Sequence, residues 1–485
     1  MDNREKLERV NAVLVKLDYL TDKFIKNKLY NKALKNISIS ASIQYAINQK
    51  YTDYSLEKKI SKISHELLKP QGGYKCNPGT ILFYDGFGLD LRGVAINYTR
   101  AIAESANLLV YVIPSGCKDR IPHIYNILSM FNVVIIELEG SNYVSKVRNL
   151  NNIFSDFKPE KAFFYSGPED VVGAVVFNSY REIVDRYHVD LVDHAFWLGI
   201  NACDYVIVSR EMGASIAVHE RGFEKKQIKR LDSYVYVCED DCSIPLPFDI
   251  KNEKYFFTGG ALYKTLGDKD LLFYKTVEYI LDKYNELKFL YAGFGDSSEI
   301  KKMMSKFPNR VYLIPERPDF YNIIQNSLFY LNSFPMFGGM MMRYAAAAGK
   351  LPVTLKHDCD SDGILIDQAN IGIEFTDYDK FLSEIDRIIT DDEYRKRKEH
   401  IVKNSVLDEK TFCLNINKLL ANNITDFSFK DIVRFDTSRF RNEYIERFDF
   451  PKDLLKHLCT KDTLYLIKHF PLMFLKKYIL RGGRI

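Results

Sequence analysis

The chain has 485 residues and a formal net charge of +4; 46% of its residues are hydrophobic and 27% are charged. The nearly balanced charge excludes nucleic-acid binding driven by bulk basicity, and the composition excludes a disordered or collagen-like chain. The length predicts about three domains, each with enough residues for a core of its own.

The eight cysteines are scattered along the chain, and only Cys238 and Cys242 lie close together. This spacing indicates neither a disulfide framework nor a zinc ribbon, so we expect no metal site. Because the sequence shows no signal peptide and no apolar run of about 18 residues, we expect a cytoplasmic protein.

Residues 1–70 are predicted to form a helical annex. Apolar side chains recur at helical spacing from Leu7 to Leu20, and further amphipathic segments cover 29–48 and 55–68. Two interpretations stay open: a surface for a partner or acceptor, and a plain packing annex, which the sequence favours.

After a linker rich in Pro and Gly at 69–80, short apolar strands alternate with helical segments, starting at 81–84. This alternation predicts parallel sheets with crossover helices. The acidic, proline-bearing segment 238–253 interrupts the pattern, which then restarts. The predicted fold class is therefore α/β, with two Rossmann-like, doubly wound domains. The expected divisions are an annex (1–70), a first lobe (78–240), a second lobe (250–422) and a helical basic C-terminal extension (423–485).

The stretch 328–355, LFYLNSFPMFGGMMMRYAAAAGKLPVTL, reads as strand, glycine loop, helix and strand. A glycine pair that opens a helix bares backbone N–H groups, and the positive end of the helix dipole favours a diphosphate there. The alternative, a tightly packed βα unit without a ligand, is about equally favoured by these residues alone.

Four short glycine-containing segments follow one another along the chain: DGFGLDLRG, FTGGALYK, YAGFGD and FGGMMMRYAAAAGKLPVT. With them, residues 80–422 resemble the nucleotide-sugar glycosyltransferases of the GT-B fold, in which two doubly wound lobes enclose a cleft. The segment VDHAFWLG (192–199) is similar to a motif of O-GlcNAc-transferase-like and bacterial protein-glycosylating enzymes. Those enzymes also carry helices ahead of their catalytic lobes.

The resemblance implies a hexosyltransferase of polysaccharide biosynthesis or protein glycosylation. It would move a sugar from a nucleoside-diphosphate sugar, expected to be UDP-linked, to a glycan, glycolipid or protein acceptor. The nucleotide sugar is a substrate, and neither a cofactor, a catalytic metal nor a nucleic acid is expected.

Donor-binding residues are expected in the second lobe, where backbone N–H groups and a basic side chain would neutralise the leaving diphosphate. Lys264 is the first candidate cation and Arg343 the second; the alternatives are a solvated loop lysine and a surface charge. The loop around Pro315 and Arg317 should lie against the nucleotide base, although Arg317 also suits packing against Asp319. The full donor set is Gly259, Gly260, Lys264, Gly293, Pro315, Arg317, Gly338, Gly339, Met340, Arg343 and Tyr344.

Catalytic residues are expected in the first lobe. His194 lies among apolar residues after a predicted strand, where an imidazole can accept a proton near neutral pH. A hydrogen-bonded core or loop histidine is an equal alternative. Asp85 and the glycines after it are candidates for the acceptor side, and a tight turn between strand and helix is the alternative.

One departure from the resembled pattern concerns ribose. The two positions where many such enzymes carry glutamates beside the small-residue helix hold Met336 and Tyr344. The alternative function is therefore a non-catalytic GT-B protein that acts as partner or chaperone of another glycosyltransferase. A sugar-nucleotide epimerase is a third interpretation, but it needs paired acidic and histidine groups that the sequence does not make evident.

The segment 452–485 mixes Leu, Phe and Tyr with many basic residues. Such an end suits peripheral contact with the anionic inner face of a membrane. A helix that packs on the first lobe and keeps a solvated basic face is the favoured alternative.

Overall fold

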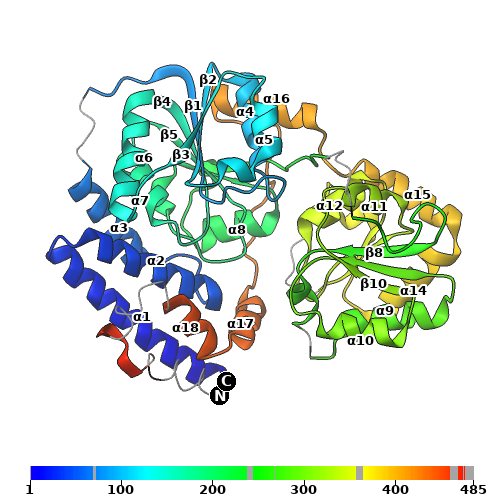
Figure 1. The fold of residues 1–485 in the computed structure, drawn as a ribbon. Helices are drawn as coiled ribbons and strands as arrows, with labels where there is room; N and C mark the ends of the chain where they lie inside the picture. Colours follow the sequence, from blue (N-terminus) through cyan, green and yellow to red (C-terminus); the bar gives the residue numbers. More distant parts are fainter. Residues whose placement is uncertain are drawn as a thin grey trace. The chain divides into compact units, whose positions relative to one another are not determined.

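The computed structural model describes residues 2–68, 73–237, 244–267, 269–356, 364–366, 368–458, 468–472 and 475. The chain divides into two compact units (Figure 1). The first unit comprises residues 1–208, 212–230 and 416–485, and the second comprises 209–211 and 231–415. The chain therefore returns to the first unit after Asn415.

The first unit contains a seven-stranded, all-parallel sheet in the order β3-β2-β1-β4-β5-β6-β7. The strand β1 is central: it pairs Ile81 with Leu109 of β2 and with Lys161 of β4. The strands are β1 (Asn77–Asp85), β2 (Leu108–Pro114), β3 (Val133–Leu138), β4 (Pro159–Tyr165), β5 (Asp185–Val189), β6 (Tyr205–Val208) and β7 (Ile228–Arg230).

Helices cover both faces of this sheet, as crossover connections between parallel strands require (Figure 1). Alternate residues of β1 face opposite sides: Leu82 and Tyr84 belong to the core beneath α6 and α7, whereas Phe83 contacts Tyr98 of α4. The crossover helices are α4 (Ala95–Ser105), α5 (Pro122–Leu128), α6 (Tyr143–Phe157), α7 (Val171–Ser179) and α8 (Glu211–His219).

The predicted N-terminal helices are present, and they pack on this sheet domain. Leu34, Ile37 and Ile60 share a single core with α6 and α7, which buries the annex against the first unit. The C-terminal helices α17 and α18 lie beside them (Figure 1). The annex helices are α1 (Asn3–Lys26), α2 (Tyr30–Ile47) and α3 (Tyr54–Leu67); the last helices are α16 (Glu409–Asn422), α17 (Ser438–Arg447) and α18 (Lys452–Leu458).

The second unit is built around a six-stranded parallel sheet in the order β10-β9-β8-β11-β12-β13. Its strands are β8 (Tyr255–Gly259), β9 (Lys288–Ala292), β10 (Val311–Ile314), β11 (Tyr330–Leu331), β12 (Pro352–Leu355) and β13 (Glu374–Phe375). Its helices are α9 (Leu272–Lys283), α10 (Ser298–Lys306), α11 (Phe320–Asn326), α12 (Gly339–Ala347), α13 (Gln368–Ile371), α14 (Tyr378–Thr390) and α15 (Asp392–Lys403).

Both faces of this second sheet are also buried. Phe256 and Phe289 pack with α9 and α14, whereas Phe257 and Tyr330 pack with α11 and α12. The predicted fold class, two Rossmann-like doubly wound domains with helical ends, is confirmed.

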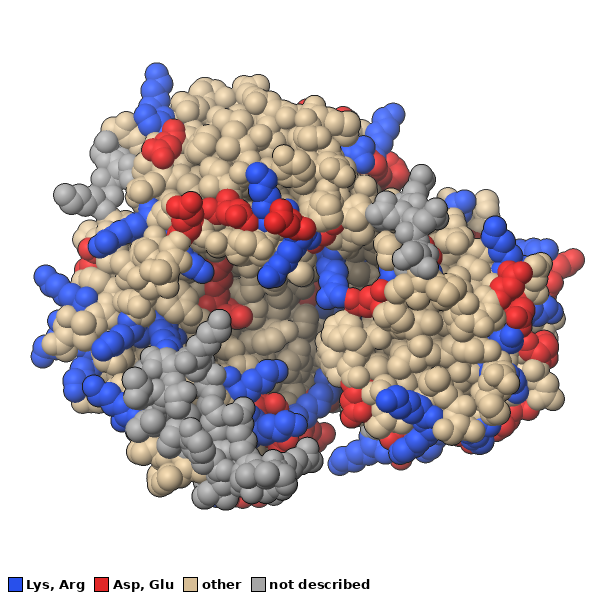
Figure 2. Space-filling model, in the orientation of Figure 1, with Lys and Arg blue, Asp and Glu red and all other residues tan. Residues whose placement is uncertain are grey.

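Basic and acidic side chains are interspersed on the face drawn in Figure 2, as the small net charge leads one to expect. In the described part of the chain, no helix is long and apolar enough to cross a membrane. Cys238 and Cys242 lie outside the described residues, as does most of the 452–485 segment beyond Leu458, so both sequence-based expectations stay predictions.

The close approach of α7 to the sheet of the first unit can be tested at Gly173. A Cβ there would lie 2.3 Å from Cε2 of Phe164 and 2.8 Å from Cε1 of Tyr84. Both rings are buried, so Gly173→Ala should lower the free energy of unfolding by about 1–3 kcal/mol despite the helix preference of Ala. Urea denaturation followed by circular dichroism measures this.

The matched control for Gly173 is Gly167→Ala. A Cβ at Gly167 would meet the flexible Glu169 carboxylate at 3.4 Å or more, so the free energy of unfolding should change by less than about 0.5 kcal/mol. Equal effects of the two substitutions would contradict the packing described here.

Candidate functional site

The order of the second sheet places a topological switch point between β8 and β11. After β8 the chain adds β9 and β10 on one side, and it then returns to add β11 and β12 on the other side, so the loops after β8 and β11 diverge here. In open parallel sheets, ligands bind in the crevice outside the carboxyl ends of the strands at such a point. The loops after β8 and β11 contain Lys264 and the glycine pair Gly338–Gly339, respectively.

These two loops are bonded to each other. The backbone N–H of Met336 donates to the carbonyl of Lys264, at 3.1 Å. In addition, α12 comes close to the end of β8, because a Cβ on Gly259 would lie 2.6 Å from Cε of Met341. The structure therefore brings together Gly259, Lys264 and the start of α12, which the sequence predicted as parts of one site.

Lys264 lies in the short 3-10 helix Leu262–Thr265 and is partly buried. Burial lowers the pKa of its ammonium group, and no neighbouring carboxylate among the described residues counteracts this effect. A partly buried cation without a counter-ion is costly. The sequence-based alternative of a solvated loop lysine does not describe this residue.

The N-terminus of α12 has no side-chain cap; the residue at its N-cap is Gly338. The first amides of the helix, beginning at Gly339 and Met340, therefore lack intrahelical acceptors and remain available to a bound anion. A helix N-terminus without a side-chain acceptor is suited to an anionic ligand.

Asn332 is a residue of this site that the sequence-based prediction missed. It is fully buried, its Oδ1 accepts from the Ser333 N–H at 3.0 Å, and its Nδ2 has no partner among the described residues. A Cβ on Gly338 would lie 2.8 Å from the same Oδ1, so Asn332 lies directly under the glycine loop. A polar residue at the carboxyl end of a buried strand was the signal that could have identified it.

Two further predicted glycines, Gly260 and Gly293, form hydrogen bonds between the ends of neighbouring strands. Gly260 has a φ of +129° and donates to the Ala292 carbonyl at 2.9 Å. Its own carbonyl lies only 1.9 Å from where a Cβ on Gly293 would be, so these loops require glycine at 293. Gly293 in turn donates to the Ile314 carbonyl, and the exposed Pro315 follows at the same edge of the sheet.

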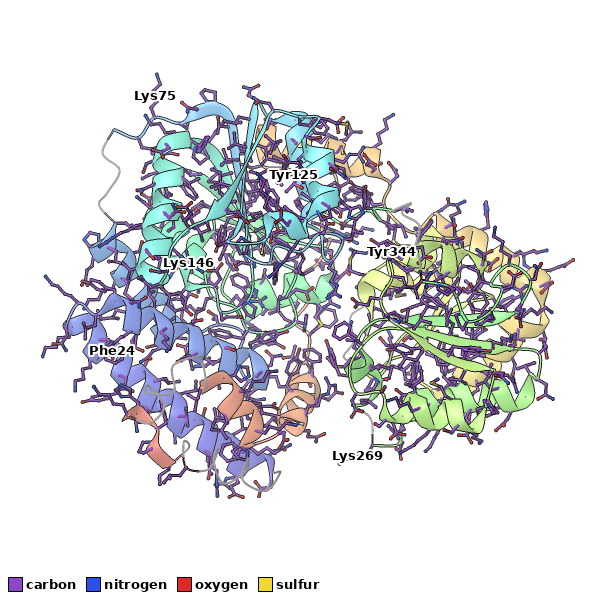
Figure 3. All side chains as sticks on the ribbon, in the orientation of Figure 1. Phe24, Lys75, Tyr125, Lys146, Lys269 and Tyr344 are labelled. Carbon is purple, nitrogen blue, oxygen red and sulfur yellow. The ribbon has the colours of Figure 1, made fainter. Side chains whose placement is uncertain are left out.

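Three side chains that were predicted to bind the donor form hydrogen bonds to other parts of the protein instead. Arg343 is buried, donates to the Ile364 carbonyl at 3.0 Å and pairs with Asp232 at 3.3 Å. Tyr344, labelled on α12 in Figure 3, donates to the Tyr236 carbonyl. Both residues follow the first turn of α12 and are buried.

Arg317 is likewise buried and forms a bidentate pair with Asp319 at 2.7 and 2.8 Å. It also donates to the Ile244 carbonyl. This is the packing role that the sequence left open for it, and it holds the loop after β10 in place.

In the first unit, His194 lies in the loop that follows β5. Its side chain is 30% exposed, and Nδ1 lies 3.4 Å from Oδ1 of Asp193. Its ring meets that of Phe440 edge to face, with centroids 6.1 Å apart. His194 is therefore neither a fully buried core histidine nor a freely solvated one, and it remains a candidate base.

Asp85 ends β1 and is completely buried. Its Oδ1 accepts from the N–H groups of Phe87 and Gly88, and its Oδ2 accepts from the Tyr111 hydroxyl at 2.8 Å. Burial raises its pKa to about 6, partly offset by these hydrogen bonds. In this arrangement Asp85 fixes the loop after β1, which matches the tight-turn alternative.

Another histidine–carboxylate pair was missed by the sequence analysis. Nδ1 of His123 contacts Oδ2 of Asp90, and Asp90 also accepts from the N–H groups of His123 and Ile124. Asp90 lies in the loop after β1, and His123 lies at the start of α5. They are 33 residues apart in the chain, so no local motif joins them. Among the described residues, no group of three His, Cys, Asp or Glu side chains could hold a metal ion.

The buried state of Asp85 predicts a pH dependence of stability. Its pKa is about 6 when folded, against an ordinary value of 3.8, so its proton stabilises the fold at low pH. That contribution is lost as the pH rises from about 4 to about 6. Asp85→Asn cannot ionise, so its free energy of unfolding relative to the unsubstituted protein should rise by about 2–3 kcal/mol from pH 3 to pH 7. Urea titrations at each pH measure it.

The control is Asp249→Asn. A hydrogen bond from Asn252 lowers the pKa of the exposed Asp249, so this substitution should lose relative stability over the same rise in pH. Equal slopes for the two variants would contradict the burial argument for Asp85.

Comparisons with known proteins bear on the fold. The sequence matches no known protein family, and no curated protein matches it. Among solved structures it is similar to TarM (10% identity, 73% of this chain and 100% of that chain, TM-score 0.54). It is also similar to a putative UDP-N-acetylglucosamine 2-epimerase from Listeria monocytogenes (12%, 71% and 96%, 0.51). A third similar structure is HepE of Anabaena in complex with UDP and glucose (14%, 70% and 99%, 0.50). With its two doubly wound sheets, the chain therefore has the GT-B fold.

Proposed function

We propose that this chain is a glycosyltransferase that moves a sugar from a UDP-linked donor to a glycan, glycolipid or protein acceptor, without a catalytic metal. One observation carries the proposal. Lys264 has no counter-ion among the described residues, and its loop is hydrogen-bonded to the loop before α12, whose N-terminus has no side-chain cap. A diphosphate would satisfy both the cation and the bare amides.

Several groups around this point support an anionic, hydrogen-bonding ligand. Asn332 lies beneath the glycine loop, and its Nδ2 has no hydrogen-bond partner among the described residues. It is a buried donor that leaves a hydrogen bond unmade, which costs about 1–3 kcal/mol unless a ligand or water accepts it. Gly338 and Gly339 have no side chain that would block approach to the backbone.

The choice of UDP is supported by two of the similar structures. One is that of a putative UDP-N-acetylglucosamine 2-epimerase, and another was obtained with UDP and glucose. In the proposed reaction, Lys264 and the α12 amides would stabilise the negative charge that develops on the leaving diphosphate. His194 would accept the proton of the acceptor nucleophile.

The alternative of a non-catalytic GT-B protein is favoured by one observation. Of the two positions where many such enzymes carry glutamates, the first holds Met336 and the second, which would bind ribose, holds Tyr344; the Tyr344 hydroxyl is bonded to the Tyr236 carbonyl. A chain that keeps its fold but binds no nucleotide would act through partner contacts. The following experiments separate the two functions.

Lys264→Met tests donor binding. The substitution keeps the length of the side chain and removes a charge that lacks a counter-ion among the described residues, so the melting temperature without ligand should stay the same or rise. The stabilisation by UDP should be lost, because a charge-assisted contact is worth about tenfold to hundredfold in Kd. Thermal-shift titration with UDP, GDP, CDP and ADP measures both effects.

Lys269→Met is the matched control, since Lys269 is an exposed lysine five positions along the same connection (Figure 3). It should respond to UDP as the unsubstituted chain does. If no nucleotide shifts the melting temperature of the unsubstituted chain, the non-catalytic alternative replaces the proposal.

His194→Ala tests the base. Removing a general base lowers turnover by about a hundredfold to ten-thousandfold, whereas UDP binding in the other unit should be unchanged. Release of UDP during incubation with UDP-sugars and a mixture of acceptors measures turnover. His400→Ala, at an exposed position of α15, is the control. A variant that loses UDP binding together with turnover would contradict the assigned role.

A further inference from the structure

The loop that carries His194 is held by side chains of the N-terminal annex. Asn48, the residue after α2, donates from Nδ2 to the His194 carbonyl at 3.0 Å and accepts at Oδ1 from the Phe196 N–H at 3.1 Å. These two contacts bracket Ala195. One amide side chain thus fixes the backbone on the carboxyl side of His194, in the manner of a neighbouring β-strand.

A second annex residue holds the far end of the same loop. Oε1 of Glu57, on α3, accepts from the Gly199 N–H at 2.7 Å. Gly199 has a φ of +107° and precedes the short helix Ile200–Ala202, so Glu57 accepts at the N-terminus of that helix. Glu57 is 1% exposed and Asn48 is fully buried.

The sheet domain also holds this loop. The buried Arg221 donates to the carbonyls of Val192, Asp193 and Ala195, the last at 2.6 Å. The Leu198 N–H donates to the Pro168 carbonyl at 3.0 Å. The backbone from 192 to 199 is therefore bonded at nearly every residue.

One side chain in this immobilised segment remains accessible. From Asp193 to Gly199 every residue is buried except His194. The C-terminal helix α17 contributes the adjoining ring of Phe440, and α17 is itself bonded to the annex, because Nε2 of Gln49 donates to the Arg441 carbonyl at 3.0 Å. The annex thus acts on His194 both directly and through α17.

The two annex residues are not the choice that stability alone would favour. Asn48 adopts a left-handed conformation (φ 43°, ψ 46°), which is strained in a residue other than glycine. Burial raises the pKa of the Glu57 carboxyl to about 7, although the backbone N–H groups of Gly199, Asn201 and Ile200 counteract this. An apolar side chain at position 57 would avoid the cost of burying this carboxyl.

We propose that the annex is a positioning element for the His194 loop, with Asn48 and Glu57 as its positioning residues. The catalytic consequence rests on the proposed function: the annex sets the rate of the step that His194 serves and leaves donor binding in the second unit unaffected. The structural consequence, an immobilised loop, does not depend on it.

Asn48→Gly is the decisive variant. Glycine accepts the left-handed backbone, so the end of α2 is retained while both contacts to the loop are lost. Hydrogen–deuterium exchange of the full-length protein should show at least about tenfold faster exchange of the amides in 194–199, with the annex helices themselves protected as before. In turnover assays, kcat should fall at least about tenfold and KM for the UDP-sugar should change less than about twofold.

Two further variants, Glu57→Gln and Asn48→Asp, should have smaller effects on loop exchange and on kcat than Asn48→Gly. The glutamine side chain would keep an oxygen acceptor for the Gly199 N–H, so Glu57→Gln should retain protection and kcat. Aspartate can accept from Phe196 but repels the His194 carbonyl, so Asn48→Asp should fall between the unsubstituted chain and Asn48→Gly.

Asn27→Ala is the control for both positions. Nδ2 of Asn27 donates to the Lys23 carbonyl at the end of its own helix, far along the chain from the His194 loop. This substitution should change neither the exchange at 194–199 nor kcat.

Unchanged exchange at 194–199 in Asn48→Gly would overturn the proposal. Faster exchange together with an unchanged kcat would also overturn it, since the loop position would then not govern turnover. If the unsubstituted chain transfers no sugar, the proposed function fails, and the exchange measurement still decides whether the annex immobilises the loop.

Discussion

The parallel pairing of β11 between β8 and β12 is the constraint on which the second unit depends. Only two residues long, β11 pairs with both neighbours, so the strand order reverses beside β8 and two loops are directed to the same edge. Lys264 and the start of α12 meet there because of this topology. The crossover connections on the two sides of the switch point run in opposite directions. The crevice at that edge of the sheet is therefore lined by the loops.

The groups at this edge differ in how well their polar atoms are satisfied. Arg343, Tyr344 and Arg317 have their hydrogen-bond partners within the protein, so they stabilise the fold whether or not a ligand is bound. Lys264, Nδ2 of Asn332 and the first amides of α12 lack such partners among the described residues. Folded proteins satisfy nearly all buried polar groups, and this contrast separates the groups that support the site from those that would contact a ligand.

The first unit follows the opposite pattern around His194. There the backbone of the loop is satisfied by Asn48, Glu57 and Arg221, which come from two parts of the annex and from the end of the sheet domain. A loop held in this way loses little further entropy when a reaction requires one orientation of its side chain. The annex and the sheet share one hydrophobic core, so the residues that hold the loop are supported by packed helices.

The sequence by itself determined the fold class, because alternating apolar strands and amphipathic helices permit few other topologies, and it identified the glycines whose backbones approach closely, such as Gly293. It also named Lys264 and His194 as candidate site residues. Tertiary structure alone decided which polar side chains are already engaged: Asp85 turned out to be bonded to Tyr111, and Arg343 to Asp232. The contacts of Asn48 with His194 and of His123 with Asp90 join residues 146 and 33 positions apart. Periodicity and local spacing cannot show such pairs, because they form only when separate helices and strands pack together.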